Sequence, residues 1–227
     1  MKREGPEAFV IEQFATAFRL QVHLLLAAGI DVARSEIEQD SEEEAITGFI
    51  ADAIHRYLIR QPVPWTKFYA VRNEHPIPNA ARPGKKRKEI DLIIELAEGE
   101  GRPEYVFEAK QLNSAKPHQQ AGNYTNTEAM GRFLAGEYAK YTARFPEVGM
   151  LGYVLSDTAA TWHGRLKGAI VARSMELSLQ LPQEEVSIVD VFPLEWTSVH
   201  DRTSATRPVT IYHILVPCIN QNGSTPP

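Results

Sequence analysis

The 227-residue sequence has little cysteine and no long apolar run. A single cysteine, Cys218, excludes an intramolecular disulfide and zinc sites built on cysteine clusters, and it is typical of a reducing compartment. The most apolar stretch, residues 24–30, is far shorter than the ~20 residues that span a bilayer. No apolar region follows the charged N-terminal residues, so we expect no signal peptide. These absences predict a cytoplasmic protein that is not held in a membrane.

Several enzyme signatures are also absent. The sequence contains no P-loop, HExxH, GxSxG or Rossmann glycine pattern. Arg207 and His213 have the R-x5-H spacing of HEPN ribonucleases, but that chemistry needs a helix and residues 209–212 are typical of a strand. The net charge of −5 argues against non-specific coating of nucleic acid, although an acidic enzyme can still carry a local basic patch.

The remaining composition is that of an ordinary globular protein, with 43% hydrophobic and 23% charged residues. We expect one domain over residues 1–219 and a disordered tail over residues 220–227. Hydrophobic periodicity predicts helices over 7–29, 42–60, 123–145 and 159–180, with a polar loop over 31–40. Ser41 and Glu44 match a capping box at the start of the second helix. His23, His55 and His163 lie in helical segments, where we interpret them as surface or packing residues.

Apolar, β-branched segments predict six strands, over 65–71, 90–96, 105–110, 150–155, 186–192 and 209–216. The first three follow one another closely and predict an antiparallel meander. The order α-α-β-β-β-α-β-α-β-β indicates one α/β domain with a mixed sheet flanked by helices.

Charged residues interrupt two of these apolar strands. Asp91 lies within the strand at 90–96, and Glu108 and Lys110 close the strand at 105–110. Residues i and i+2 of a strand share a face, so Glu108 and Lys110 present a carboxylate beside an ammonium. A tight turn between the two strands would bring Asp91 near both. A charge inside an apolar strand costs several kcal/mol unless it is paired or exposed, so the pattern indicates a functional cluster.

Two carboxylates and a lysine at one sheet edge suit divalent-metal chemistry. Mg²⁺ prefers one or two carboxylates together with water and phosphate oxygens. Such a site can polarise a phosphodiester and lower the pKa of a bound water. The lysine can orient or deprotonate that water, or stabilise charge in the transition state. An isolated acid-x-Lys pattern arises by chance roughly once or twice in a chain of this length, so the strand context carries the argument.

Together with an upstream acid, these residues resemble the signature of the PD-(D/E)XK nuclease superfamily, which has the restriction-endonuclease-like fold. The resembling residues are Glu43, Asp91, Glu108 and Lys110. The family core, α-β-β-β-α-β, corresponds to residues 42–155. The resemblance implies that Asp91, Glu108 and the carbonyl of Ala109 bind Mg²⁺, for which Mn²⁺ can substitute. It also implies that Lys110 assists the attacking water and that Glu43 completes the site.

Two positions of the family pattern need separate comment, the helical acid and the residue before Asp91. Glu43 lies three residues before Ile46, so it shares the buried helix face, and Glu42 is the alternative. Glu44 is better explained by capping. Ile90 stands where the family name places a proline, a departure common in the family.

Basic residues near the cluster suit a phosphate backbone. The run Lys85, Lys86, Arg87 and Lys88 precedes Asp91, and Arg132 follows in the next helix. A solvated loop and an ion pair between Arg132 and Glu128 are the alternatives for these groups. We therefore predict a metal-dependent DNA endonuclease.

The resemblance further implies a homodimer and a role in bacterial defence or restriction, with an operon-encoded partner. Two alternatives stay open. One is a non-catalytic subunit of the same fold that docks to a larger, ATPase-containing complex. The other is a nuclease directed at RNA.

Overall fold

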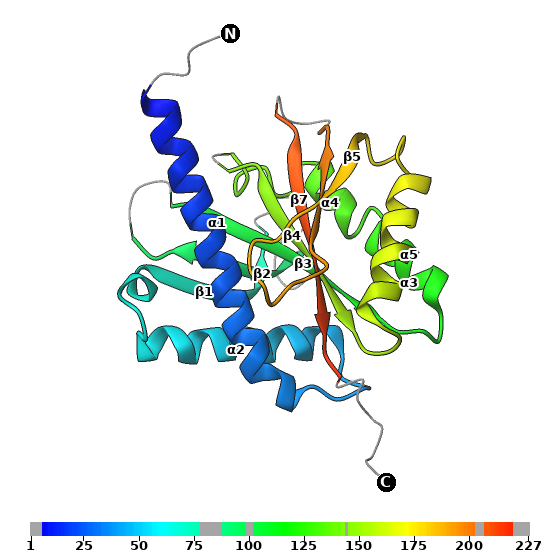
Figure 1. Cartoon of the computed structure of the whole chain (residues 1–227), viewed down its shortest axis with the longest axis horizontal. Coiled ribbons are helices and arrows are strands. Elements are labelled where there is room, and N and C mark those ends of the chain that lie inside the picture. Colours follow the sequence, from blue (N-terminus) through cyan, green and yellow to red (C-terminus); the bar gives the residue numbers. More distant parts are fainter. Residues whose placement is uncertain (1–5, 78–87, 99–101, 144, 203–206, 220–227) are drawn as a thin grey trace.

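The computed structural model describes residues 6–77, 88–98, 102–143, 145–202 and 207–219. Within these residues, a seven-stranded mixed sheet lies between two layers of helices (Figure 1). The helices are α1 (Pro6–Ala33), η1 (Arg34–Glu36), α2 (Glu43–Arg60), η2 (Pro64–Phe68), α3 (Pro117–Tyr124), α4 (Met130–Leu134) and α5 (Ala159–Ala172). The strands are β1 (Tyr69–Pro76), β2 (Glu89–Leu96), β3 (Glu104–Leu112), β4 (Glu147–Val154), β5 (Leu179–Glu185), β6 (Trp196–His200) and β7 (Val209–Pro217).

The sheet order is β1-β2-β3-β4-β7-β6-β5. The central strands β3, β4 and β7 are parallel, and the outer strands pair antiparallel. Parallel strands are normally covered on both faces, and β4 is buried along nearly its whole length. Gly149 in β4 leaves room for the ring of Phe107 in β3, because a Cβ there would collide with that ring.

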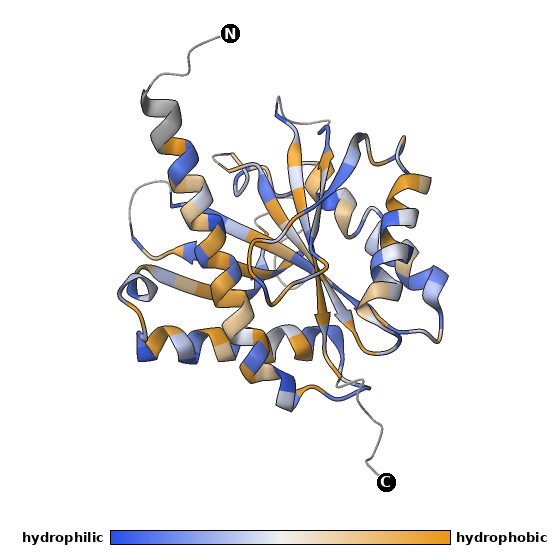
Figure 2. Cartoon of the chain, viewed as in Figure 1, coloured by the Kyte–Doolittle hydropathy of each residue, from blue (hydrophilic) through white to orange (hydrophobic). Residues whose placement is uncertain are grey.

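Each face of the sheet has its own hydrophobic core. Residues of α1 and α2 pack against one face, and residues of α3, α4 and α5 pack against the other. Figure 2 shows hydrophobic residues concentrated along the central strands and along the helices that cover them. Cys218, beside the end of β7, is buried and has a free thiol.

The structure confirms much of the predicted order of elements. The helices predicted over 7–29 and 42–60 correspond to α1 and α2, although α1 continues to Ala33 and shortens the predicted loop. The strands predicted over 90–96, 105–110, 150–155 and 209–216 correspond to β2, β3, β4 and β7. The antiparallel meander of β1, β2 and β3 is also confirmed.

Two predicted helices are wrong in extent. The segment 123–145 contains only the end of α3 and the short α4. There the side chain of Asn126 accepts the backbone N–H of Glu128, and Gly136 has a φ of 76°, so helical hydrogen bonding is interrupted. The helix predicted over 159–180 ends at Ala172, and Ser178, with a φ of 47°, turns the chain into β5.

Two strand predictions and the capping box are wrong as well. The first strand begins at Tyr69, because Pro64 starts a 3₁₀ helix over the residues before it. The segment 186–192 is not a strand, and neither β5 nor β6 was predicted. Helix α2 has Glu42 at its N-cap without a side-chain cap. The hydroxyl of Ser41, one residue before this N-cap, instead accepts the backbone N–H of Glu38 in the preceding turn.

Within the described residues, one helical stretch, Ile11–Glu36, is long and apolar enough to cross a membrane by composition alone. Its residues Val22, Leu25 and Leu26 are fully buried in the core beneath α1. The core helix of a soluble protein can have the same length and apolar composition, so this stretch is only weak evidence for a membrane span. The predicted disordered tail, residues 220–227, lies outside the described residues.

Candidate active site

The candidate site lies where β2 and β3 stop pairing. The antiparallel ladder between them ends at the pair of Leu92 and Phe107. Asp91 directly precedes Leu92 in β2, and Glu108 directly follows Phe107 in β3. Beyond that pair, the carboxylate of Asp91 replaces a backbone acceptor: its Oδ2 accepts the N–H of Ala109 at 2.7 Å. This hydrogen bond fixes the side chain of Asp91 against β3. The sequence predicted that a turn between two antiparallel strands would bring Asp91 to this position.

Helix α2 brings a second carboxylate to β3. Glu43, the first residue of α2, accepts the ammonium of Lys110 at 2.6 Å through Oε1 and the backbone N–H of Gln111 at 3.0 Å through Oε2. The ammonium also donates to the carbonyl of Ala109 at 2.5 Å. Among the residues that the structure describes, no hydrogen bond or ion pair joins Glu42, the N-cap of α2, to this cluster. Of the two acids that the sequence left open, Glu43 is therefore the one in contact with the cluster.

Glu108 is the most deeply buried carboxylate of the cluster, with 1% of its side chain exposed. Its Oε1 accepts Nη1 of Arg132 at 2.6 Å and the hydroxyl of Tyr138 in a short hydrogen bond. Its Oε2 is buried and has no hydrogen-bond partner in the part of the chain that the structure describes. A buried carboxylate oxygen without a donor is costly, so this atom is poised to receive a ligand.

Burial and mutual repulsion perturb every acid of the cluster. Burial, followed by the charge of Asp91, raises the pKa of Glu108 to about 8. Burial also raises the pKa of Asp91 and the pKa of Glu43, against the opposing charge of Lys110. Burial lowers the pKa of Lys110, but Glu43, Asp91 and Glu108 together outweigh it, and the net pKa is raised. Lys110 is thus an ammonium at neutral pH, and a bound cation would stabilise the ionised forms of the acids, whose pKa values are raised.

The residues present fit a divalent ion of the Mg²⁺ type. Hard oxygen donors are available from Asp91, Glu108 and the carbonyl of Ala109, and Oε2 of Glu108 lacks a partner. Among the described residues, no group of three or more His, Cys, Asp or Glu side chains is arranged to hold a metal. Mg²⁺ commonly uses one or two carboxylates and completes its shell with water and substrate oxygens, so a larger protein cage is not required.

The basic residues of the predicted nucleic-acid contact are only partly described. Lys85, Lys86 and Arg87 lie outside the described residues. Lys88 is described, and its ammonium forms ion pairs with Glu137 at 2.8 Å and with Glu128 at 3.1 Å.

Sequence reasoning did not place Tyr138 among the site residues, although its hydroxyl donates to Glu108. Arg132 and Tyr138 are six positions apart, which in the predicted helix would place them about 120° apart around the axis. In the structure the chain leaves α4 at Leu134 and turns back, so both side chains reach Glu108. No local pattern in the sequence signals this convergence.

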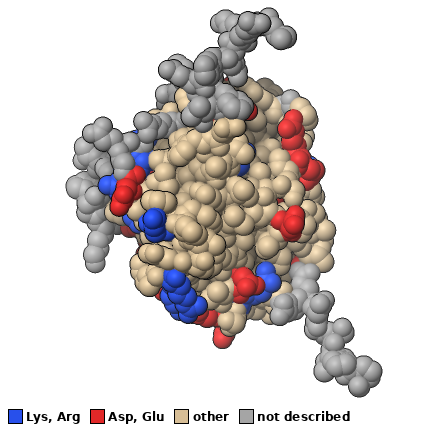
Figure 3. Space-filling view, turned by 60° about the vertical axis from the view of Figure 1, so that its left-hand side comes forward, with Lys and Arg blue, Asp and Glu red and all other residues tan. Residues whose placement is uncertain are grey.

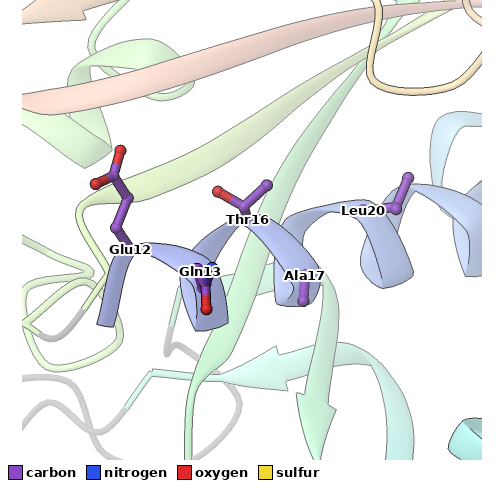
Figure 4. Close-up of a pocket in the computed structure, with 5 residues that line it drawn as sticks. All are labelled: Glu12, Gln13, Thr16, Ala17 and Leu20. Atoms are coloured by element: carbon purple, nitrogen blue, oxygen red, sulfur yellow. The ribbon is translucent and has the colours of Figure 1, made fainter. Parts of the chain in front are cut away.

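Two surface hollows lie away from the carboxylates. One follows α1 and is lined by Glu12, Gln13, Thr16, Ala17 and Leu20 (Figure 4). The other lies between α1 and β1 and is lined mainly by aromatic rings, including Phe14, Phe18 and Trp65. Figure 3 shows a broad surface with few charged residues on the side turned forward. Neither hollow contains a residue of the cluster.

Comparison of the chain with protein-family models, with curated proteins and with solved structures found no match. The geometry around Asp91 and Glu108 therefore carries the functional argument by itself.

Proposed function

We propose that this protein is a metal-dependent endonuclease that hydrolyses DNA phosphodiester bonds and belongs to the restriction-endonuclease-like fold. One observation carries the proposal: acids from α2, β2 and β3 gather around residues 108–111 of β3, where β2 and β3 separate, and their charges act on Lys110. The sheet order and the flanking helices are compatible with that fold. Mg²⁺ is the expected metal, and Mn²⁺ can substitute.

Each residue of the cluster has a role that follows from its contacts. Asp91 and Glu108 would hold the metal with the carbonyl of Ala109. When bound, the metal polarises a phosphodiester and acidifies a coordinated water. Lys110 stays protonated beside its acids, so it orients the attacking water or stabilises phosphate charge rather than acting as the base.

Glu43 acts mainly by holding Lys110. Its two oxygens accept the lysine ammonium and the N–H of Gln111, which fixes both the side chain and the strand that carries it. We therefore expect Glu43 to position Lys110, whereas Asp91 and Glu108 contact the metal.

The substrate and cellular context extend this proposal. DNA would approach through the basic run at 85–88, as the sequence predicts, whereas the guanidinium of Arg132, predicted as a second contact, is engaged with Glu108. A homodimer and a role in defence against phage stay predictions of the family resemblance. The operon-encoded partner and the cytoplasmic location stay predictions as well, the latter from the composition of the sequence.

A second candidate function is a docking subunit that keeps the fold without the reaction. The observation in its favour is that Glu43 and Asp91 already have protein donors, since both oxygens of Glu43 and one of Asp91 accept hydrogen bonds. A cluster satisfied in this way can serve stability alone. Metal binding separates the two functions, because a purely structural cluster would bind no Mg²⁺ or Mn²⁺.

The deciding experiment combines cleavage with metal binding. Purified protein is incubated with plasmid DNA, linear DNA and single-stranded RNA in Mg²⁺, Mn²⁺ or EDTA, beside the Asp91→Asn and Lys110→Met variants. Lys67→Met is the matched control, because Lys67 is an exposed lysine of η2 outside the cluster. We expect metal-dependent DNA cleavage that falls at least about 100-fold in both site variants and is unchanged in the control.

Other outcomes would change the assignment. Preferential cleavage of RNA would support the RNA-directed alternative. Metal binding by calorimetry without cleavage of any substrate would indicate a missing partner. An absence of both binding and cleavage would refute the nuclease proposal and favour the docking subunit.

A further inference from the structure

The segment between β3 and β4 places two donors on one oxygen of Glu108. Arg132 of α4 and Tyr138 in the turns after α4 both donate to Oε1, and Arg132 and Tyr138 are themselves linked at 3.0 Å. We propose that Arg132 and Tyr138 are positioning residues that hold Oε1 of Glu108 and so keep Oε2 free for the metal. This inference rests on the proposed metal-dependent nuclease function.

The contacts of Glu108 divide its two oxygens sharply. Oε1 has two side-chain donors, whereas Oε2 is buried without any donor within the described ranges. The two oxygens of a carboxylate are equivalent, so the donors fix the orientation of the group and not the identity of the oxygen. Turning the carboxylate away from Arg132 and Tyr138 would break two charge-assisted hydrogen bonds. The pair of donors therefore fixes the direction in which the unpartnered oxygen is presented.

The side chain of Arg132 is largely buried and is held by contacts within the protein. Only 12% of its side chain is exposed. Its Nη1 also donates to the backbone carbonyl of Glu89 at 3.0 Å, which attaches the guanidinium to the first residue of β2. A guanidinium with three protein acceptors on one nitrogen is suited to fixing Glu108, and a free phosphate contact would need it to leave these partners.

Arg132 and Tyr138 thus orient the carboxylate of Glu108 through hydrogen bonds to one oxygen, and the other oxygen is left for the metal. Groups that orient a metal ligand in this way typically change metal affinity 10–100-fold when they are removed.

A matched pair of hydroxyl deletions tests this inference. Tyr138→Phe removes the donor to Glu108 and keeps the ring, which packs near Tyr141 at a centroid distance of 6.5 Å. Tyr141→Phe is the control, because the hydroxyl of Tyr141 is buried without a hydrogen-bond partner among the residues described. Mn²⁺ affinity is measured by calorimetry at a temperature where circular dichroism shows each protein folded, so a loss of stability alone does not change the result.

We expect Tyr138→Phe to bind Mn²⁺ about tenfold more weakly than the unmodified protein and Tyr141→Phe to bind it equally well. In a Glu108→Gln background, Tyr138→Phe should cause no further change, because the positioned carboxylate is already gone. Arg132→Lys should recover part of the affinity that Arg132→Ala loses, because lysine keeps one charged donor.

Two results would overturn the inference and can be told apart. If the unmodified protein binds Mn²⁺ and Tyr138→Phe binds it equally well, positioning by Tyr138 is wrong although the metal site stands. If the unmodified protein binds no Mn²⁺, the proposed function fails and the positioning role fails with it.

Discussion

The buried carboxylate of Glu108 should make the stability of this protein depend strongly on pH. Its pKa is raised from an ordinary value of 4.5 to about 8 in the folded protein, chiefly by burial. Folding therefore favours the protonated acid. The unfolded chain releases its proton from about pH 4.5 upward, whereas the folded chain keeps it until about pH 8, so the free energy of unfolding falls across this interval.

The size of the effect follows from the two pKa values. Because each pKa unit corresponds to about 1.4 kcal/mol, the full cost above pH 8 is on the order of 5 kcal/mol. Glu108→Gln removes this cost and keeps the shape and the acceptor for Arg132 and Tyr138. We expect the variant and the unmodified protein to be about equally stable near pH 4.5, and the variant to gain several kcal/mol in relative stability by pH 8.5.

Urea unfolding at pH 5, 7 and 8.5 in EDTA measures this difference. Glu89→Gln is the control, because Glu89 is an exposed acid at the start of β2 and its backbone carbonyl still accepts Arg132. The control should differ from the unmodified protein by the same amount at each pH. A stability difference for Glu108→Gln that does not grow with pH would refute the assignment of a raised pKa to this residue.

Three further predictions concern the metal and the core. Mg²⁺ at 100 times its dissociation constant should raise the free energy of unfolding of the unmodified protein by about 2.7 kcal/mol at pH 8, as measured by urea unfolding. The same Mg²⁺ concentration should leave the stability of Glu108→Gln unchanged. Equal effects on the two proteins would exclude Glu108 as a ligand. Gly149→Ala should cost about 1–3 kcal/mol, because the new Cβ collides with the ring of Phe107, and an unchanged urea midpoint would contradict this packing. Arg19→Ala should cost about 1–2 kcal/mol, since Arg19 donates to both oxygens of Glu147 at 2.7 and 2.8 Å and joins α1 to β4, and urea unfolding that shows no loss would disprove the link.

Part of the candidate site could be predicted from local sequence. Asp91 and Glu108 interrupt apolar strands that are consecutive along the chain, and consecutive strands joined by a tight turn pair antiparallel. That rule alone brings the two acids to the same end of the β2–β3 pair, where the structure places them. The apolar periodicity of α2 also placed Glu43 on the helix face toward the sheet.

Only the tertiary structure decided the surroundings of Glu108. Arg132 and Tyr138 reach it because Asn126 and Gly136 interrupt a segment whose apolar spacing predicts one continuous helix. The apolar residues of that segment, such as Phe133 and Tyr141, are buried nonetheless. The apolar spacing therefore predicted correctly that these residues are buried, but it did not predict the backbone conformation.

Strand β6 was missed for a related reason. Ser198 and His200 of β6 are buried, and hydrogen bonds satisfy their side chains. The hydroxyl of Ser198 lies 2.7 Å from Nε2 of His200 and 2.7 Å from Nε2 of His213. A strand whose inward positions are polar has no alternating apolar pattern to read. Its place between β5 and β7 depends on partners distant in the chain, and such non-local pairing is settled only when the whole sheet assembles. The sequence by itself therefore determined β2 and β3 and the acids that they carry, because their apolar residues are local in the chain, and the assembled sheet decided the remaining pairing and which side chains surround those acids.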